Sequence, residues 1–313
     1  MNDEYWERDA LRDIALEGIR ERRRARRWSI FFRFLFLGYL VLLLLMARGF
    51  DFWLGGDDAP GPHTAVVKIN GALLPDGENR AENIIRGLQN AYRDERTAGV
   101  ILQVNSPGGS PVQSGQINAE IRRLKARYPD MPIYTVAEDM FTSGAYYAAV
   151  STDRIYVDQG TLIGSIGVLI NSFGFHEAMD RLGIERRLYT AGDSKGFLDP
   201  FSAAEPEDEA WIEGLLTDVH EQFIEAVKTG RGDRLADDDR LFSGLVWTGE
   251  QGVELGLADE LGSLGHVARE VIGVEEIRDF TPQAGVLQRF AGRIGVSIGD
   301  RLASSLLGDY IVR

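Results

Sequence analysis

The 313-residue sequence contains no cysteine, and only four of its 34 basic residues are lysines. The absence of cysteine excludes disulfides, thiolate metal sites and cysteine nucleophiles. Arginine carries almost all of the positive charge, so each lysine calls for an explanation of its own. The formal net charge of −14 argues against nucleic acid as a partner.

A long apolar run follows a basic cluster near the N-terminus. Six arginines lie in residues 20–27, and the next 20 residues, Trp28–Ala47, are apolar except for a few positions such as Arg33. At roughly 1.5 Å per residue this run spans about 30 Å, the thickness of a membrane core. The arginines before it predict a cytoplasmic N-terminus and an extracytoplasmic body, anchored once in the cytoplasmic membrane. A cleaved signal peptide is the alternative, although a 27-residue charged leader is long for one.

The sequence divides into five predicted parts. These are a cytoplasmic arginine-rich segment (1–27), a transmembrane helix (28–47), a linker (48–63), a folded domain (64–280) and a C-terminal amphipathic extension (281–313).

Strands and helices alternate along the folded domain, which predicts an α/β fold. The apolar patterns predict three early strands, 64–69, 99–105 and 132–138, and helices over 81–95, 114–128 and 143–150. After the 161–170 segment they predict a short helix over 176–182, a strand over 185–190 and a long helix that includes 211–227.

The segment VNSPGGS (Val104–Ser110) ends a predicted buried strand with Ser-Pro-Gly-Gly. Pro107 fixes φ, and the two glycines allow the backbone to turn its N–H groups outward, as an oxyanion site requires. An ordinary strand-to-helix turn is the alternative interpretation.

The segment DMFTSGAYYAAV (Asp139–Val150) places Ser143 where a predicted strand turns into a helix. A serine at such a turn, followed by Gly144, exposes its hydroxyl at the carboxyl edge of a sheet, where α/β folds carry their sites. The alternative role for Ser143 is a helix N-cap.

A nucleophilic serine needs a base, and the four histidines are weak candidates. His63 falls in the predicted linker, and His220 and His266 fall in helical patterns that favour surface or interface positions. His176 lies in the α/β region, but its place at the start of a short helix favours a capping or surface role.

Lys195 is the other candidate base. It lies in a loop that contains glycine and proline, TAGDSKGFLDPFS. A desolvated lysine loses its proton more easily and can then accept one from a serine. The hydroxyl of Ser165, in the segment GSIGV, could hold the amine of Lys195 in place. The alternatives are a solvated loop charge for Lys195 and a small-residue strand bend for Ser165.

Together the motifs VNSPGGS, FTSGAYYAA, GTLIGSIGV and AGDSK resemble, in order and approximate spacing, the bacterial signal peptide peptidases of the SppA type. The resemblance covers residues 64–280 and implies a crotonase-like (Clp-protease-like) domain of repeated ββα units. The family more often has alanine at the position of Thr142 and glycine at that of Ala145, which bears on pocket shape more than on mechanism.

The resemblance also implies roles for residues of this chain. Ser143 matches the family's nucleophile, Lys195 its general base and Ser165 the serine that orients the base, while Gly109 and Gly144 match the oxyanion hole. It implies no cofactor and no metal. It further implies cleavage of peptides, among them residual signal peptides in the membrane, by a homo-oligomeric ring.

Two other classes compete with a peptidase. A crotonase-type acyl-CoA enzyme would share the oxyanion glycines, but it would need coenzyme A outside the cytoplasm. A catalytically inactive membrane scaffold fits the predicted anchor but leaves the pairing of Ser143 with Lys195 unexplained.

Overall fold

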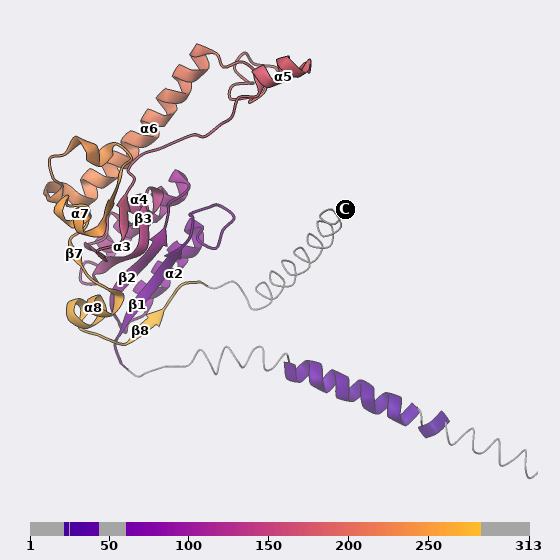
Figure 1. Cartoon of the computed structure of the whole chain (residues 1–313). Helices are drawn as coiled ribbons and strands as arrows, with labels where there is room; N and C mark the ends of the chain where they lie inside the picture. The colour runs from indigo at the N-terminus through magenta and orange to yellow at the C-terminus, as the bar shows by residue number, and fades with distance from the viewer. Residues whose placement is uncertain (1–21, 25, 44–60, 283–313) are drawn as a thin grey trace, which may run out of the picture. The chain divides into compact units, whose positions relative to one another are not determined.

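The computed structural model describes residues 22–24, 26–43 and 61–282 (Figure 1). The chain divides into two compact units, of which one extends from Gly61 to Ala284 and the other holds the N-terminal residues. Residues 22–24 and 26–43 are helical. Among the described helices, none combines the length and apolar character needed to cross a membrane. Residues 44–47 of the predicted transmembrane segment, and the C-terminal extension from 283 onward, lie outside the described residues.

Eight strands and a set of helices and helical turns make up the larger unit. The strands are β1 (His63–Asn70), β2 (Thr97–Ser106), β3 (Ile133–Thr142), β4 (Arg154–Val157), β5 (Leu162–Gly164), β6 (Val246–Thr248), β7 (Glu260–Leu261) and β8 (Ile277–Asp279). The helices and turns are α2 (Ala81–Arg93), α3 (Pro111–Arg127), α4 (Gly144–Ala149), α5 (His176–Leu182), α6 (Pro206–Arg231), η1 (Gly232–Arg234), η2 (Asp239–Phe242), α7 (Gly249–Glu254), α8 (Leu264–His266) and η3 (Val267–Ile272).

The strands form one mainly parallel sheet in the order β6-β5-β3-β2-β1-β8, with β4 beside β3 and β7 beside β4. The β5–β6 pair is antiparallel. Apolar side chains on one face pack against α2, α3 and α4 in a single large core. A smaller cluster on the other face packs against η3. The fold is therefore mixed α/β, as the alternating sequence pattern predicts.

Strand β3 changes its neighbour along its length. Its first half pairs with β4, and residues Met140–Thr142 pair instead with β5. This second pairing sets Thr142 opposite Gly164, while Ser106 of β2 lies opposite Phe141. The carboxyl ends of three neighbouring parallel strands, β2, β3 and β5, therefore meet at one edge of the sheet.

Residues 169–205, here called the arm, separate β5 from α6. None of them is buried. Figure 1 shows α5, within the arm, at the N-terminal end of α6 and away from α4 and the sheet. Large apolar side chains of the arm are exposed, including Phe173 (70%), Leu182 (74%) and Tyr189 (89%). Exposed apolar side chains that gather in one segment are typical of surfaces that contact another protein or a membrane.

Several sequence predictions are corrected. The predicted strand over 185–190 is irregular, because the arm offers no neighbouring strand to which its backbone can bond. Within the 161–170 segment, for which no element was predicted, β5 covers Leu162–Gly164. His63 belongs to β1 and not to the linker: it is 4% exposed, and its Nε2 lies 3.2 Å from the hydroxyl of Thr97. The short helix over 176–182 is confirmed.

Candidate active site

Ser143 lies in a strained turn between β3 and α4. Its φ of 52° and ψ of −128° fall where residues with a side chain seldom occur, and such strain is typical of functional turns. Its N–H donates to the carbonyl of Gly164 (2.8 Å), and its own carbonyl accepts from Tyr147 (3.0 Å). In the described chain the Ser143 hydroxyl makes no hydrogen bond, and it does not cap α4 through its side chain. The turn therefore presents a free hydroxyl at the sheet edge.

The helix that follows Ser143, α4, is buried and holds the backbone of the turn in place. Tyr146 of α4 is fully buried, and its hydroxyl donates to the carbonyl of Leu257 (2.8 Å). Burial raises the pKa of Tyr146 above its usual value, so this phenol stays protonated. Tyr146 thus acts as a fixed anchor for α4 and not as a base for Ser143.

The glycine loop after β2 lies against this turn. The N–H of Leu73 donates to the carbonyl of Gly108 (2.8 Å), and the N–H of Ser110 donates back to the carbonyl of Leu73 (2.9 Å). A Cβ added to Gly108 would come within 2.6 Å of the Gly144 nitrogen, and one added to Gly109 would overlap the backbone of Leu73. Only glycine fits at both positions, where φ is +99° and +145°.

Two backbone donors remain free at this contact. Within the described chain, neither the N–H of Gly109 nor that of Gly144 donates to another protein group. The Gly109 nitrogen lies 3.1 Å from the position that a Cβ on Gly144 would take, so the two amides are close neighbours. Paired free N–H groups beside a serine hydroxyl form the arrangement that stabilises an oxyanion.

Ser165 follows β5 directly and lies beside Ser143, because Thr142 and Gly164 are register partners. It too has a positive φ, 52°, and its N–H donates to the carbonyl of Leu245 (2.7 Å). The two serines thus leave parallel neighbouring strands at the same edge, each through a strained residue.

A cavity of about 420 Å³ joins these groups. Ser143, Ser165, Gly109 and Gly144 all line it. Its remaining walls are mostly apolar or small: Pro111, Tyr147, Gly167, Val168, Leu169, Val219, Phe223, Ser243 and Gly244. Four of the five predicted site residues therefore share one cavity, large enough for a peptide side chain and the atoms of a peptide bond.

Lys195, the fifth, is elsewhere. It is an exposed residue of the arm and does not line the Ser143 cavity. The other three lysines have partners: Lys68 pairs with Asp279 (2.9 Å), Lys125 with Asp153 (2.8 Å), and Lys228 lies over the Phe242 ring. Within the described chain the ammonium of Lys195 has no such partner.

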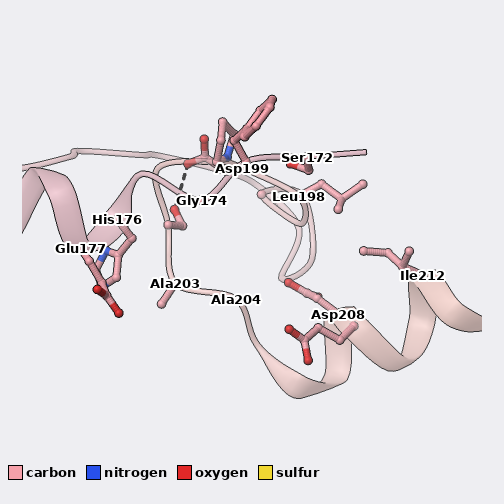
Figure 2. A pocket seen from close by; sticks show the side chains of 15 residues that line it. Ser172, Gly174, His176, Glu177, Leu198, Asp199, Ala203, Ala204, Asp208 and Ile212 are labelled. Atoms are coloured by element: carbon pink, nitrogen blue, oxygen red, sulfur yellow. Dashed lines mark hydrogen bonds between the residues drawn. The ribbon is translucent and has the colours of Figure 1, made fainter. Parts of the chain in front are cut away.

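His176 is also separated from Ser143. It lies in the arm beside a second hollow, of about 570 Å³, between α5 and the start of α6. Figure 2 shows His176 and Glu177 on one side of this hollow and Asp208 and Ile212 on the other. The His176 Nε2 lies 3.6 Å from the Asp180 carboxylate. His176 therefore does not complete a serine–histidine pair within the described chain.

Sequence reasoning missed a contact that His220 makes beside the cavity. This residue of α6 is half-buried, and its Nε2 lies 3.1 Å from the carbonyl oxygen of Ile166, next to Ser165. The helical pattern that favoured a surface or interface position for His220 carries no information about a contact 54 positions away.

The chain is similar in sequence to known peptidases. Residues 125–275 match the model of peptidase family S49, a segment that includes Ser143, Ser165 and Lys195. The chain is 29% identical to the putative signal peptide peptidase SppA of Enterococcus faecium, over 63% of this chain and 59% of that protein. It is 31% identical to protease 4 of Haemophilus influenzae, over 78% of this chain and 39% of that protein.

A third relative carries a different name. The chain is 38% identical to a Na(+)/H(+) antiporter NhaA of Brucella melitensis biotype 1, over 75% of this chain but 32% of that protein. The matched region thus covers about a third of the length of the first curated relatives. The resemblance to SppA-type serine peptidases is confirmed by the family match and by the Enterococcus and Haemophilus relatives.

Proposed function

Because residues 125–275 carry a peptidase family S49 domain and the chain is similar to SppA-type serine peptidases, we propose that it cleaves peptides through Ser143. One observation carries the proposal: a free serine hydroxyl in a strained turn shares a cavity with two unpaired backbone N–H groups. The proposal includes the Clp-protease-like form of the α/β fold.

In the first step, the Ser143 Oγ attacks the carbonyl carbon of the scissile peptide bond, and the neutral amine of Lys195 takes the hydroxyl proton. The N–H groups of Gly109 and Gly144 donate to the resulting oxyanion. The C–N bond then breaks, Lys195 returns the proton to the leaving amine, and an ester to Ser143 remains. Water, deprotonated by Lys195, then attacks the ester carbonyl carbon. The bond to the Ser143 Oγ breaks, the Oγ takes the proton back from Lys195, and the acid is released. Ser165 orients the lysine amine.

Lys195 reaches the cavity from a second copy of the chain. Support comes from its exposed position on the arm, its lack of a partner in the described chain, and the apolar arm residues that a second copy would cover. A head-to-tail contact of this kind generates a ring when the rotation closes. The homo-oligomer is thus part of the catalytic proposal, because each site is incomplete without its neighbour.

Location and substrate extend the proposal. The basic cluster and apolar run of residues 20–47 support a single membrane anchor with the peptidase domain outside the cytoplasm. The mainly apolar cavity walls suit apolar peptide segments. Residual signal peptides, which are apolar and remain in the membrane, are therefore the proposed substrates.

The test is labelling and complementation. The full chain in mild detergent should react with a fluorophosphonate at Ser143 and cleave an apolar reporter peptide, and both Ser143→Ala and Lys195→Ala should lose cleavage. Lys195→Arg should also fail, because a guanidinium stays protonated. His176→Ala should retain most activity. A wild-type chain that is neither labelled nor active would contradict the peptidase and favour an inactive scaffold.

Mixing the two inactive variants decides where Lys195 comes from. If the base comes from a neighbouring copy, co-assembled Ser143→Ala and Lys195→Ala chains should recover about a quarter of the wild-type activity at equal amounts, the fraction of interfaces that pair two intact groups. No recovery from verified mixed assemblies would contradict the second-copy arrangement and indicate a base from the same chain.

A further inference from the structure

Helix α6 forms one wall of the Ser143 cavity. Val219 and Phe223 line the cavity, and Phe223 stacks on Tyr147 with ring centroids 5.1 Å apart. His220 lies between these two wall residues in sequence. Its ring does not line the cavity but turns toward the chain that leaves β5, where its Nε2 lies 3.1 Å from the Ile166 carbonyl oxygen.

The acceptor determines the state of the ring. A carbonyl oxygen can only accept, so the Nε2 of His220 must carry the hydrogen. The Ile166 side chain is fully buried, which leaves its backbone oxygen little access to water. The His220 ring therefore supplies the hydrogen bond that this carbonyl requires.

Three consecutive residues at the end of β5, Gly164, Ser165 and Ile166, are each held by a different part of the chain. The Gly164 carbonyl accepts from Ser143, the Ser165 N–H donates to Leu245, and the Ile166 carbonyl accepts from His220. Between the first and third of these bonds lies Ser165, with its positive φ. Removing one bond frees a segment whose conformation is already strained.

We infer that His220 is a positioning residue: through the Ile166 carbonyl it fixes Ser165 and the adjoining cavity wall relative to Ser143. This inference rests on the proposed function. Because the arm ends where α6 begins, the same bond links the helix that carries the arm to the segment beside the nucleophile.

The rest of α6 does not depend on this bond. Near its C-terminus the buried Arg231 donates to both carboxylate oxygens of Asp259 (2.7 and 3.1 Å) and to the carbonyl of Gly256. With the Phe223–Tyr147 stack, these contacts keep the helix in place when His220 is replaced. A change at His220 should therefore act on the site more than on the fold.

Three substitutions test the inference. In glutamine, the amide nitrogen occupies the position of the histidine Nε2, whereas in asparagine it corresponds to Nδ1. We expect His220→Ala and His220→Asn to lower kcat and the rate of fluorophosphonate labelling by about tenfold to a hundredfold, the effect of a misplaced catalytic group. KM should change less. His220→Gln should recover most of the loss, and Gln222→Ala, an exposed neighbour on α6, should behave as wild type.

The outcomes separate the possibilities. Wild-type kcat and labelling in His220→Ala would overturn the inference. Loss in His220→Gln equal to that in His220→Ala, with thermal stability retained, would also overturn it, because the basic nitrogen and not the N–H would then matter. If His220→Ala does not fold, the comparison of glutamine with asparagine still decides. A wild-type chain without labelling or cleavage would refute the proposed function itself, before any variant is compared.

Discussion

Replacing Ser143 by glycine should stabilise the protein relative to replacing it by alanine, although both variants lose the nucleophile. Residue 143 has φ at 52° and ψ at −128°. Glycine adopts these angles without steric cost, whereas alanine, like serine, is strained there because of its Cβ. The comparison removes the hydroxyl in both variants and therefore isolates the backbone.

The magnitude follows from two opposing terms. Strain of this type costs about 1–3 kcal/mol, while the more flexible unfolded chain of a glycine variant costs about 0.4–1 kcal/mol. The glycine variant should therefore be more stable than the alanine variant by about 0.5–2 kcal/mol. In a unit of this size each kcal/mol shifts Tm by about 2–4 °C.

Thermal unfolding of the two variants, each confirmed to be unreactive toward fluorophosphonate, measures the difference. Ala145→Gly, in the first turn of α4, is the matched control. There glycine should destabilise by about 1 kcal/mol, because Ala145 is helical and has no positive φ for glycine to relieve. Equal Tm values for the glycine and alanine variants at position 143 would refute the argument that the turn stores strain.

Three further predictions concern the glycine loop, a buried ion pair and the membrane. Gly108→Ala should lose fluorophosphonate labelling and about 1–3 kcal/mol of stability, because its Cβ would press on the Ser143 turn; Gly115→Ala on α3, where the new Cβ only contacts Tyr147, should keep both. Burial opposes ionisation of Asp259, but hydrogen bonds and charge from Arg231 hold its pKa below the ordinary 3.8. The ionised carboxylate therefore stabilises the fold above pH 3.8, and this stabilisation is lost as the pH falls through the depressed pKa. Urea unfolding should show Asp259→Asn less stable than wild type by about 3–5 kcal/mol at neutral pH, with the difference shrinking in acid. A difference in unfolding free energy that does not change with pH would contradict this. A reporter fused after Arg313 should be active only outside the cytoplasm, and activity inside would contradict the predicted topology.

Much of the architecture follows from local sequence patterns. Alternating apolar stretches predict the succession from β1 to α4, because burial of one face imposes a period on the sequence wherever the chain is regular. The bounds of α5, His176–Leu182, also agree. Turn chemistry marked Ser143 and the two glycines after Pro107 as candidates, and the order of the four motifs favoured them over an ordinary turn and a helix N-cap.

Contacts between distant residues could not be predicted in the same way. The shift of β3 from β4 to β5 sets Gly164 beside Thr142, and no local pattern encodes that pairing. The bond from His220 to Ile166 joins two segments that look unremarkable apart. The strand predicted over 185–190 failed because a β-pattern forms a strand only where a neighbour supplies hydrogen bonds.

The sequence by itself determined which groups are available for chemistry: a serine at a predicted strand-to-helix turn, two consecutive glycines after Pro107, and a lysine in a loop. Tertiary structure alone decided which of them meet. Strand register brought Ser143, Ser165, Gly109 and Gly144 around one cavity and left Lys195 on an exposed arm. Composition and periodicity are properties of short stretches of chain, whereas a site is made by hydrogen bonds and packing between residues that only the folded sheet brings within a few ångströms of each other.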